Sequence, residues 1–115
     1  LGALFPRPVV TAGMEINPAQ LPVFRGGSSI GAAAKDMKIV DGMVQPTRGV
    51  SVFDSAARVE RFGGAYRIKS VPADLKVIQR GNDLTHFEIA PRVPMSEARY
   101  QELLRQVQTE RVPGR

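Results

Sequence analysis

Glycine and proline interrupt this chain along its whole length. The 115 residues include 11 Gly and 9 Pro, and both residue types mark turns and loops more often than helix interiors. Most of the intervals between them suit a short strand better than a long helix. This punctuation predicts a domain of short strands joined by tight connections and argues against a helical bundle.

Size and composition indicate one globular domain. An apolar content of 43% with 23% charged residues is typical of a folded chain, and a chain of this length buries one core with little room for a second unit. We therefore expect a single domain over residues 1–115, with 1–20 as a proline-interrupted, irregular arm that holds at most one short strand. No apolar run is long enough to span a bilayer, and the first residues lack a signal-peptide pattern.

The basic residues exclude some classes of partner. The net charge is +5, and most of the 16 basic residues are Arg, which favours bidentate contacts with phosphate. A GC-rich genome gives the same bias, and the charges are spread along the chain, so a polybasic membrane or nucleic-acid tail is not supported. With no Cys and one His, disulfides and thiolate metal sites are excluded and no metal is expected.

Alternating apolar residues predict a strand-rich core. The expected strands are 21–25, 49–53, 65–70, 75–80 and 84–90. Two short helices are expected over 32–38 and 56–62, the second with Ala56, Val59 and Phe62 on one apolar stripe. The turns between the last three strands make a meander the simplest arrangement.

The clearest helix follows Ser96, which we expect to cap it. Met95 and Tyr100 have the spacing of a hydrophobic staple, and an apolar stripe follows at Tyr100, Leu103, Leu104 and Val107. Pro113 and Gly114 close this segment. The sequence therefore predicts an α+β fold with a mainly antiparallel sheet, short helices and a C-terminal amphipathic helix.

The segment 84–90 contains the only histidine. Because strand side chains alternate, Phe87 and Ile89 point one way, and His86 and Glu88 point the other. An imidazole and a carboxylate two residues apart suit acid/base or electrostatic catalysis. They also suit an ordinary amphipathic strand with a solvated outer face.

Three segments resemble small type VI secretion effector toxins with an ADP-ribosyltransferase-like fold. The resemblance covers about residues 49–104 and rests on the segments Gly49-Val50-Ser51-Val52-Phe53-Asp54, Pro72-x-Asp74-Leu75-Lys76-Val77 and Thr85-His86-Phe87-x-Ile89-x-Pro91-x-x-Pro94-Met95. A fainter match lies at 21–25, an apolar strand that ends in Arg25. The chain departs from the family at Val50, where a threonine is expected, and at Glu88, where a hydroxyl residue is expected.

The resemblance implies an antibacterial effector of interbacterial competition. Such a toxin is delivered by a contact-dependent system, acts in the target-cell cytoplasm and is neutralised in its producer by an immunity protein, here expected to be acidic. It implies an NAD-dependent ADP-ribosyltransferase or NAD glycohydrolase with Ser51 and His86 in the cleft. Arg25, Ser51 and Glu88 also follow the Arg-Ser-Glu order of ADP-ribosyltransferases in general.

These residue types suit cleavage of the nicotinamide N-glycosidic bond. Glu88 can stabilise an oxocarbenium-like ribose, Arg25 beside Gly26 can bind the pyrophosphate, and Ser51 can bind ribose or hold Glu88. Tyr66 is the candidate for stacking on nicotinamide, whereas Tyr100 belongs to the helix stripe. Taken singly, Arg25 and Ser51 also suit a surface residue and a half-buried strand hydroxyl.

Two other functions stay open. A small ribonuclease toxin of the barnase, colicin and RelE-like kind would use Glu88 and His86 as base and acid, with Arg67 or Arg80 on the phosphorane. A non-catalytic adaptor or immunity-like module would depend on neither residue. The sequence leaves open the macromolecular acceptor, the oligomeric state and whether the chain belongs to a larger effector.

Overall fold

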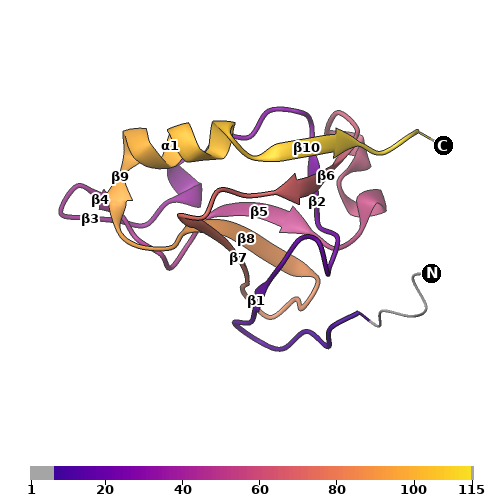
Figure 1. Ribbon diagram of the computed structural model, residues 1–115, viewed down its shortest axis with the longest axis horizontal. Coiled ribbons are helices and arrows are strands. Elements are labelled where there is room, and N and C mark those ends of the chain that lie inside the picture. The colour runs from indigo at the N-terminus through magenta and orange to yellow at the C-terminus, as the bar shows by residue number, and fades with distance from the viewer. Residues whose placement is uncertain (1–6, 115) are drawn as a thin grey trace.

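A computed structural model describes residues 7–114, so part of the N-terminal arm, 1–6, lies outside the described residues. It is an α+β fold dominated by a curled antiparallel sheet with one α-helix (Figure 1). The main sheet has seven strands in the order β1-β7-β8-β5-β2-β6-β10. In chain order these strands are β1 (Glu15–Ile16), β2 (Phe24–Gly26), β5 (Val50–Phe53), β6 (Ala65–Ser70), β7 (Leu75–Gln79), β8 (His86–Pro91) and β10 (Gln108–Arg111).

The predicted strands are confirmed, with shifts of a few residues at their ends. The strand expected at 21–25 begins three residues later, at Phe24, and Leu21 and Val23 are buried ahead of it. The arm contributes the short β1, which pairs with β7. On β5, Val50 and Val52 are buried while Ser51 and Phe53 are half-buried, as the alternation predicts.

The predicted meander is wrong between β6 and β7. These strands follow each other in sequence, but β6 pairs with β2 and β10, whereas β7 pairs with β1 and β8. Both edges of β6 are thus occupied by strands from distant parts of the chain. Strand pairing depends on contacts between residues far apart in the chain, so the turn at 71–74 does not determine which strands pair.

The two predicted short helices are instead short 3₁₀ turns, one in the first segment and two in the second. Residues 32–38 contain η2 (Ala34–Asp36), whose N-cap is Ala33, and the Asp36 carboxylate accepts the Ala33 N–H at 2.9 Å. Residues 56–62 form η3 (Ala56–Arg58) and η4 (Glu60–Phe62), ended by a left-handed Gly63 with φ 99°. Isolated turns this short bury no continuous stripe: Val59 is buried, but Phe62 is 59% exposed.

The C-terminal helix is confirmed and shorter than predicted. Helix α1 (Glu97–Arg105) begins at Ser96, whose Oγ accepts the Arg99 N–H, and it buries the side chains of Tyr100, Leu103 and Leu104. The chain then enters β10, a strand that the sequence did not predict, because its exposed residues are mostly polar. Within residues 7–114 no helix has both the length and the apolar character needed to cross a bilayer.

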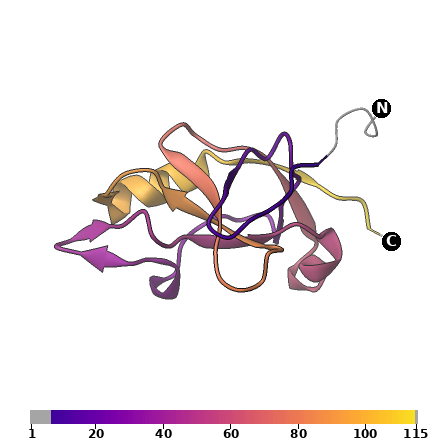
Figure 2. The same cartoon turned by 90° about the horizontal axis from the view of Figure 1, so that it is seen from below.

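A small second sheet was also not predicted. It consists of β3 (Ile39–Val40), β4 (Met43–Val44) and β9 (Met95–Ser96) in the order β3-β4-β9. The β3–β4 hairpin extends from one end of the molecule (Figure 2). The core lies between α1 and the main sheet, where the buried Tyr100 hydroxyl donates to the Ile89 carbonyl. This contact ties α1 to the strand that carries His86 and Glu88.

Candidate functional site

Ser51, His86 and Glu88 meet on the central strands β5 and β8. These strands are antiparallel, with Ser51 directly opposite Glu88 and Phe53 directly opposite His86. Residues opposite each other in an antiparallel pair share a face of the sheet. The alternation that buries Val50 and Val52 therefore brings the three candidate side chains together.

The Ser51 hydroxyl and the His86 ring form a directed hydrogen-bonded pair. Ser51 Oγ lies 2.9 Å from His86 Nε2, and His86 Nδ1 lies 2.7 Å from the backbone carbonyl oxygen of Arg80. A carbonyl only accepts, so Nδ1 carries a proton, and in the neutral ring Nε2 is left to accept the Ser51 hydroxyl proton. The loop before β8 thus fixes the tautomer of His86.

Glu88 is more buried than an amphipathic strand would leave it. The residue is 8% exposed, so the expectation of a solvated outer face at this position is wrong. Its Oε1 accepts the Gly49 N–H at 2.9 Å, and Arg80 Nε lies 3.3 Å from the same oxygen without hydrogen-bond geometry. Its Oε2 lies 3.7 Å from His86 Nε2. Glu88 is therefore a buried carboxylate next to the Ser51–His86 pair, and the Gly49 N–H and the Arg80 side chain lie close to its charge.

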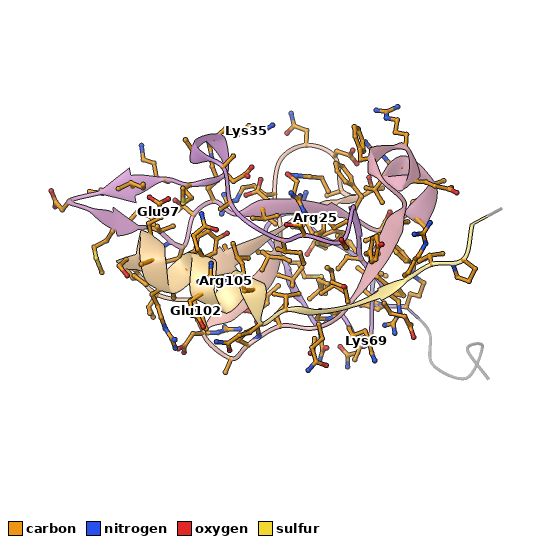
Figure 3. All side chains as sticks on the ribbon, turned by 90° about the horizontal axis from the view of Figure 1, so that it is seen from above. Arg25, Lys35, Lys69, Glu97, Glu102 and Arg105 are labelled. Atoms are coloured by element: carbon orange, nitrogen blue, oxygen red, sulfur yellow. The ribbon has the colours of Figure 1, made fainter. Side chains whose placement is uncertain are left out.

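Arg25 sits where β2 separates from β5. The two strands pair at a single position, Phe24 opposite Phe53, and beyond it Arg25 Nη1 donates to the Ser51 carbonyl at 2.9 Å. Arg25 Nε is buried with no hydrogen-bond partner. Figure 3 shows Arg25 near the middle of the molecule, seen from the α1 side.

A pocket of about 360 Å³ opens beside these residues. It is lined by Arg25, Gly26, Lys35, Ser51, Phe53, Val59 and Phe62. The lining combines two cations, a hydroxyl and apolar or aromatic side chains, and none of the described residues that line it carries a carboxylate. Such a lining suits a ligand that carries an anionic group next to a flat or apolar one. We name this cavity the Ser51 pocket.

Of the two other candidate binding residues, Gly26 lines the Ser51 pocket and Tyr66 does not. A Cβ on Gly26 would lie 2.5 Å from Phe62 Cβ and 2.8 Å from the Val59 carbonyl, so the packing of η4 already requires glycine there. Tyr66 pairs with Arg25 across β2 and β6, but its ring contacts the Arg111 guanidinium at 5.9 Å and does not line the Ser51 pocket. Phe62 is the exposed aromatic residue that lines it.

The sequence did not single out Lys35, Phe62 or Gly49 as site residues. Lys35 lies in a segment predicted to be helical, and Phe62 lies on a predicted apolar stripe; neither local pattern indicates the pocket. Gly49 could be found only through the register of β5 against β8, which sets Ser51 opposite Glu88. Arg67, named for the ribonuclease, pairs with Glu110 at the β6–β10 edge at 2.9 Å, whereas Arg80 lies at the site.

Comparison with protein-family models, with curated proteins and with solved structures finds no match to this chain. Within residues 7–114, no group of three His, Asp or Glu side chains is arranged to hold a metal ion. The function therefore has to be inferred from the site itself.

Proposed function

We propose that this chain is an NAD-consuming enzyme, an ADP-ribosyltransferase or NAD glycohydrolase with an ADP-ribosyltransferase-like fold. One observation carries the proposal: Arg25, Ser51 and Glu88 lie on β2, β5 and β8, which are neighbours in the sheet in that order. An Arg, a Ser and a Glu on successive strands are the pattern of the ADP-ribosyltransferases that the sequence resembles.

In this proposal the Ser51 pocket holds the dinucleotide. The guanidinium of Arg25 and the ammonium of Lys35 attract its phosphates, and the exposed Phe62 offers an apolar surface to a base. Ser51 lines the pocket, so its hydroxyl meets the ribose. NAD thus enters as a substrate, bound by residues from β2, η2, β5 and η4.

Glu88 acts in this proposal from behind Ser51. Cleavage of the glycosidic bond leaves positive charge on the ribose, and a carboxylate in a site largely screened from water stabilises that charge more strongly than one in bulk solvent. His86 Nε2 lies close to both the Ser51 hydroxyl and the Glu88 carboxylate. It can accept a proton, through Ser51, from the water or acceptor hydroxyl that attacks the ribose, and Glu88 then balances the imidazolium.

We further propose that the enzyme is an antibacterial toxin that is delivered into a target cell and acts in its cytoplasm. An activity that depletes NAD or modifies a macromolecule harms any cell that contains it, so a producer needs a cognate immunity protein. The Ser51 pocket is cationic, which supports an acidic contact surface on that protein.

The deciding experiment incubates the purified chain separately with NAD and with total RNA. We expect loss of NAD with release of nicotinamide, and no such loss with Ser51→Ala. Intact NAD with shortened RNA would favour the ribonuclease. The observation that supports this alternative is that the Arg80 side chain contacts Glu88 while the Arg80 carbonyl holds the His86 ring. If neither is consumed and expression in a bacterial cytoplasm is harmless, the non-catalytic module is favoured.

A further inference from the structure

The surroundings of the Ser51 hydroxyl are those of an activated nucleophile, which is a different property from binding a ribose. We propose that Ser51 attacks acyl or phosphoryl centres with His86 as its general base, so that the chain transfers such groups from esters onto Ser51. This activity requires no NAD and goes beyond the function proposed above.

The geometry supplies the three parts that such a nucleophile needs. Ser51 Oγ is within hydrogen-bond reach of His86 Nε2 at 2.9 Å, and the opposite nitrogen is held at 2.7 Å by the Arg80 carbonyl. A hydroxyl, a base and a group that orients the base form the constellation by which activated nucleophiles are recognised. Here the orienting group is a backbone carbonyl, which side-chain mutation does not remove.

Glu88 completes the electrostatics of the pair. Its Oε2 lies 3.7 Å from His86 Nε2, the nitrogen that takes up the Ser51 proton in this proposal. When His86 accepts the Ser51 proton, the new positive charge therefore forms next to a buried negative one. Phe53 covers the imidazole, with ring centroids 5.1 Å apart, and limits the ring's freedom to turn away.

The Ser51 pocket indicates the class of substrate. Ser51 lines the pocket together with the cationic Arg25 and Lys35 and the apolar Phe62. Figure 3 shows Lys35 at the periphery and Arg25 further inside. The cations suit an anionic group and also stabilise the negative charge that develops on an attacked carbonyl or phosphoryl oxygen. We therefore assign an anionic ester with an apolar or aromatic part.

Attack on a carboxylic ester acylates Ser51 and releases an alcohol. A bond forms between Ser51 Oγ and the carbonyl carbon, and the bond from that carbon to the leaving oxygen breaks. The proton of the Ser51 hydroxyl moves to His86 Nε2 and from there to the leaving alkoxide. With a fluorophosphonate, the Oγ–P bond forms, the P–F bond breaks, fluoride leaves and the proton stays on His86.

The first test is labelling with an alkyl fluorophosphonate, followed by peptide mapping. We expect one adduct per chain, on Ser51, that is absent from Ser51→Ala and from the unfolded chain. Labelling of His86→Gln should be slower by about 10² or more, the usual contribution of a general base. Ser70→Ala, which removes an exposed hydroxyl from β6, should label like the wild type.

A second test does not depend on removing His86. The chain has no cysteine, so Ser51→Cys and Ser70→Cys each carry a single thiol. A thiol paired with an imidazole ionises more readily, and we expect iodoacetamide to alkylate Ser51→Cys about fivefold faster than Ser70→Cys at pH 7. Adducts spread over several serines, or equal alkylation of the two thiols, would overturn the proposal whether or not NAD is consumed.

Discussion

Gly49 and Glu88 are joined by a buried hydrogen bond, in which the glycine N–H donates to the Glu88 Oε1 atom at 2.9 Å. Gly49 immediately precedes β5, the strand that carries Ser51, so this bond links the backbone on one side of the site to the carboxylate on the other. It leaves Oε2 as the oxygen that faces His86. The position and the charge of Glu88 can therefore be tested separately.

The charge is tested by Glu88→Gln. The amide oxygen can still accept from Gly49, so the fold should survive, whereas the negative charge behind His86 is lost. We expect NAD turnover to fall by about 10² or more, as for one preorganised electrostatic group. Turnover and thermal unfolding are measured together, with the exposed Glu110→Gln as the control. Near-wild-type turnover in a folded Glu88→Gln variant removes Glu88 from the mechanism.

The position is tested by Gly49→Ala. An added Cβ would overlap the Ile89 carbonyl and lie 2.8 Å from Ala90 Cα, and these backbone atoms belong to a central strand that cannot easily move. We expect a loss of about 2–3 kcal/mol in the free energy of unfolding, typical of overpacking. Gly31→Ala is the matched control, since its Cβ meets only Gln101 Oε1 at 3.6 Å. Equal denaturation midpoints for the two variants would contradict this account.

Arg25→Lys tests substrate binding in the Ser51 pocket. Lysine keeps the charge but loses the planar fork that donates to Ser51 and reaches into the pocket. We expect KM for NAD to rise about tenfold, with a smaller effect on kcat, because a phosphate contact acts in ground state and transition state alike. Steady-state kinetics decide it, with Arg105→Lys on the surface of α1 as control. An unchanged KM would show that the phosphates of NAD do not bind at Arg25.

The lowered pKa of Asp83 should make the stability of the fold depend on pH in the acid range. Hydrogen bonds from the Thr85 hydroxyl and from Arg58 hold the Asp83 pKa well below its usual value. A carboxylate with a lowered pKa stabilises the fold above its unfolded-state pKa, near 3.9, and this contribution is lost as the pH falls below that value. Asp83→Asn should lower the melting temperature at pH 7, by somewhat less at pH 3, and by progressively less as the pH falls further toward the folded-state pKa. A constant difference across this range would contradict the linkage.

The sequence predicted the strands of the site better than the way they assemble. Alternation located β5 and β8 because both carry Val, Ile or Phe on one face, and it placed His86 and Glu88 on the same side. It could not supply the register that sets Ser51 opposite Glu88, nor the insertion of β5 and β2 between β8 and β6. These depend on contacts between residues far apart in the chain.

The pocket shows a second limit of local patterns. Phe62 has the spacing of a core residue, but isolated 3₁₀ turns leave it 59% exposed. Lys35 has no local feature that separates it from other surface lysines, and only the tertiary fold brings it to Ser51. The predicted residues Ser51, His86, Glu88 and Arg25 are nevertheless brought together, because each lies on one of three adjacent strands.

The last prediction concerns the immunity protein proposed above. If it covers the Ser51 pocket with an acidic surface, its association should slow between low and physiological ionic strength, since salt screens the attraction. Lys35→Gln should slow association several-fold at low salt, because Lys35 lines the pocket. Lys69→Gln removes the same charge from β6, on the other side of the view in Figure 3, and should have little effect. Equal effects of the two variants would show that only net charge matters, and binding that leaves NAD turnover intact would contradict a partner that covers this pocket.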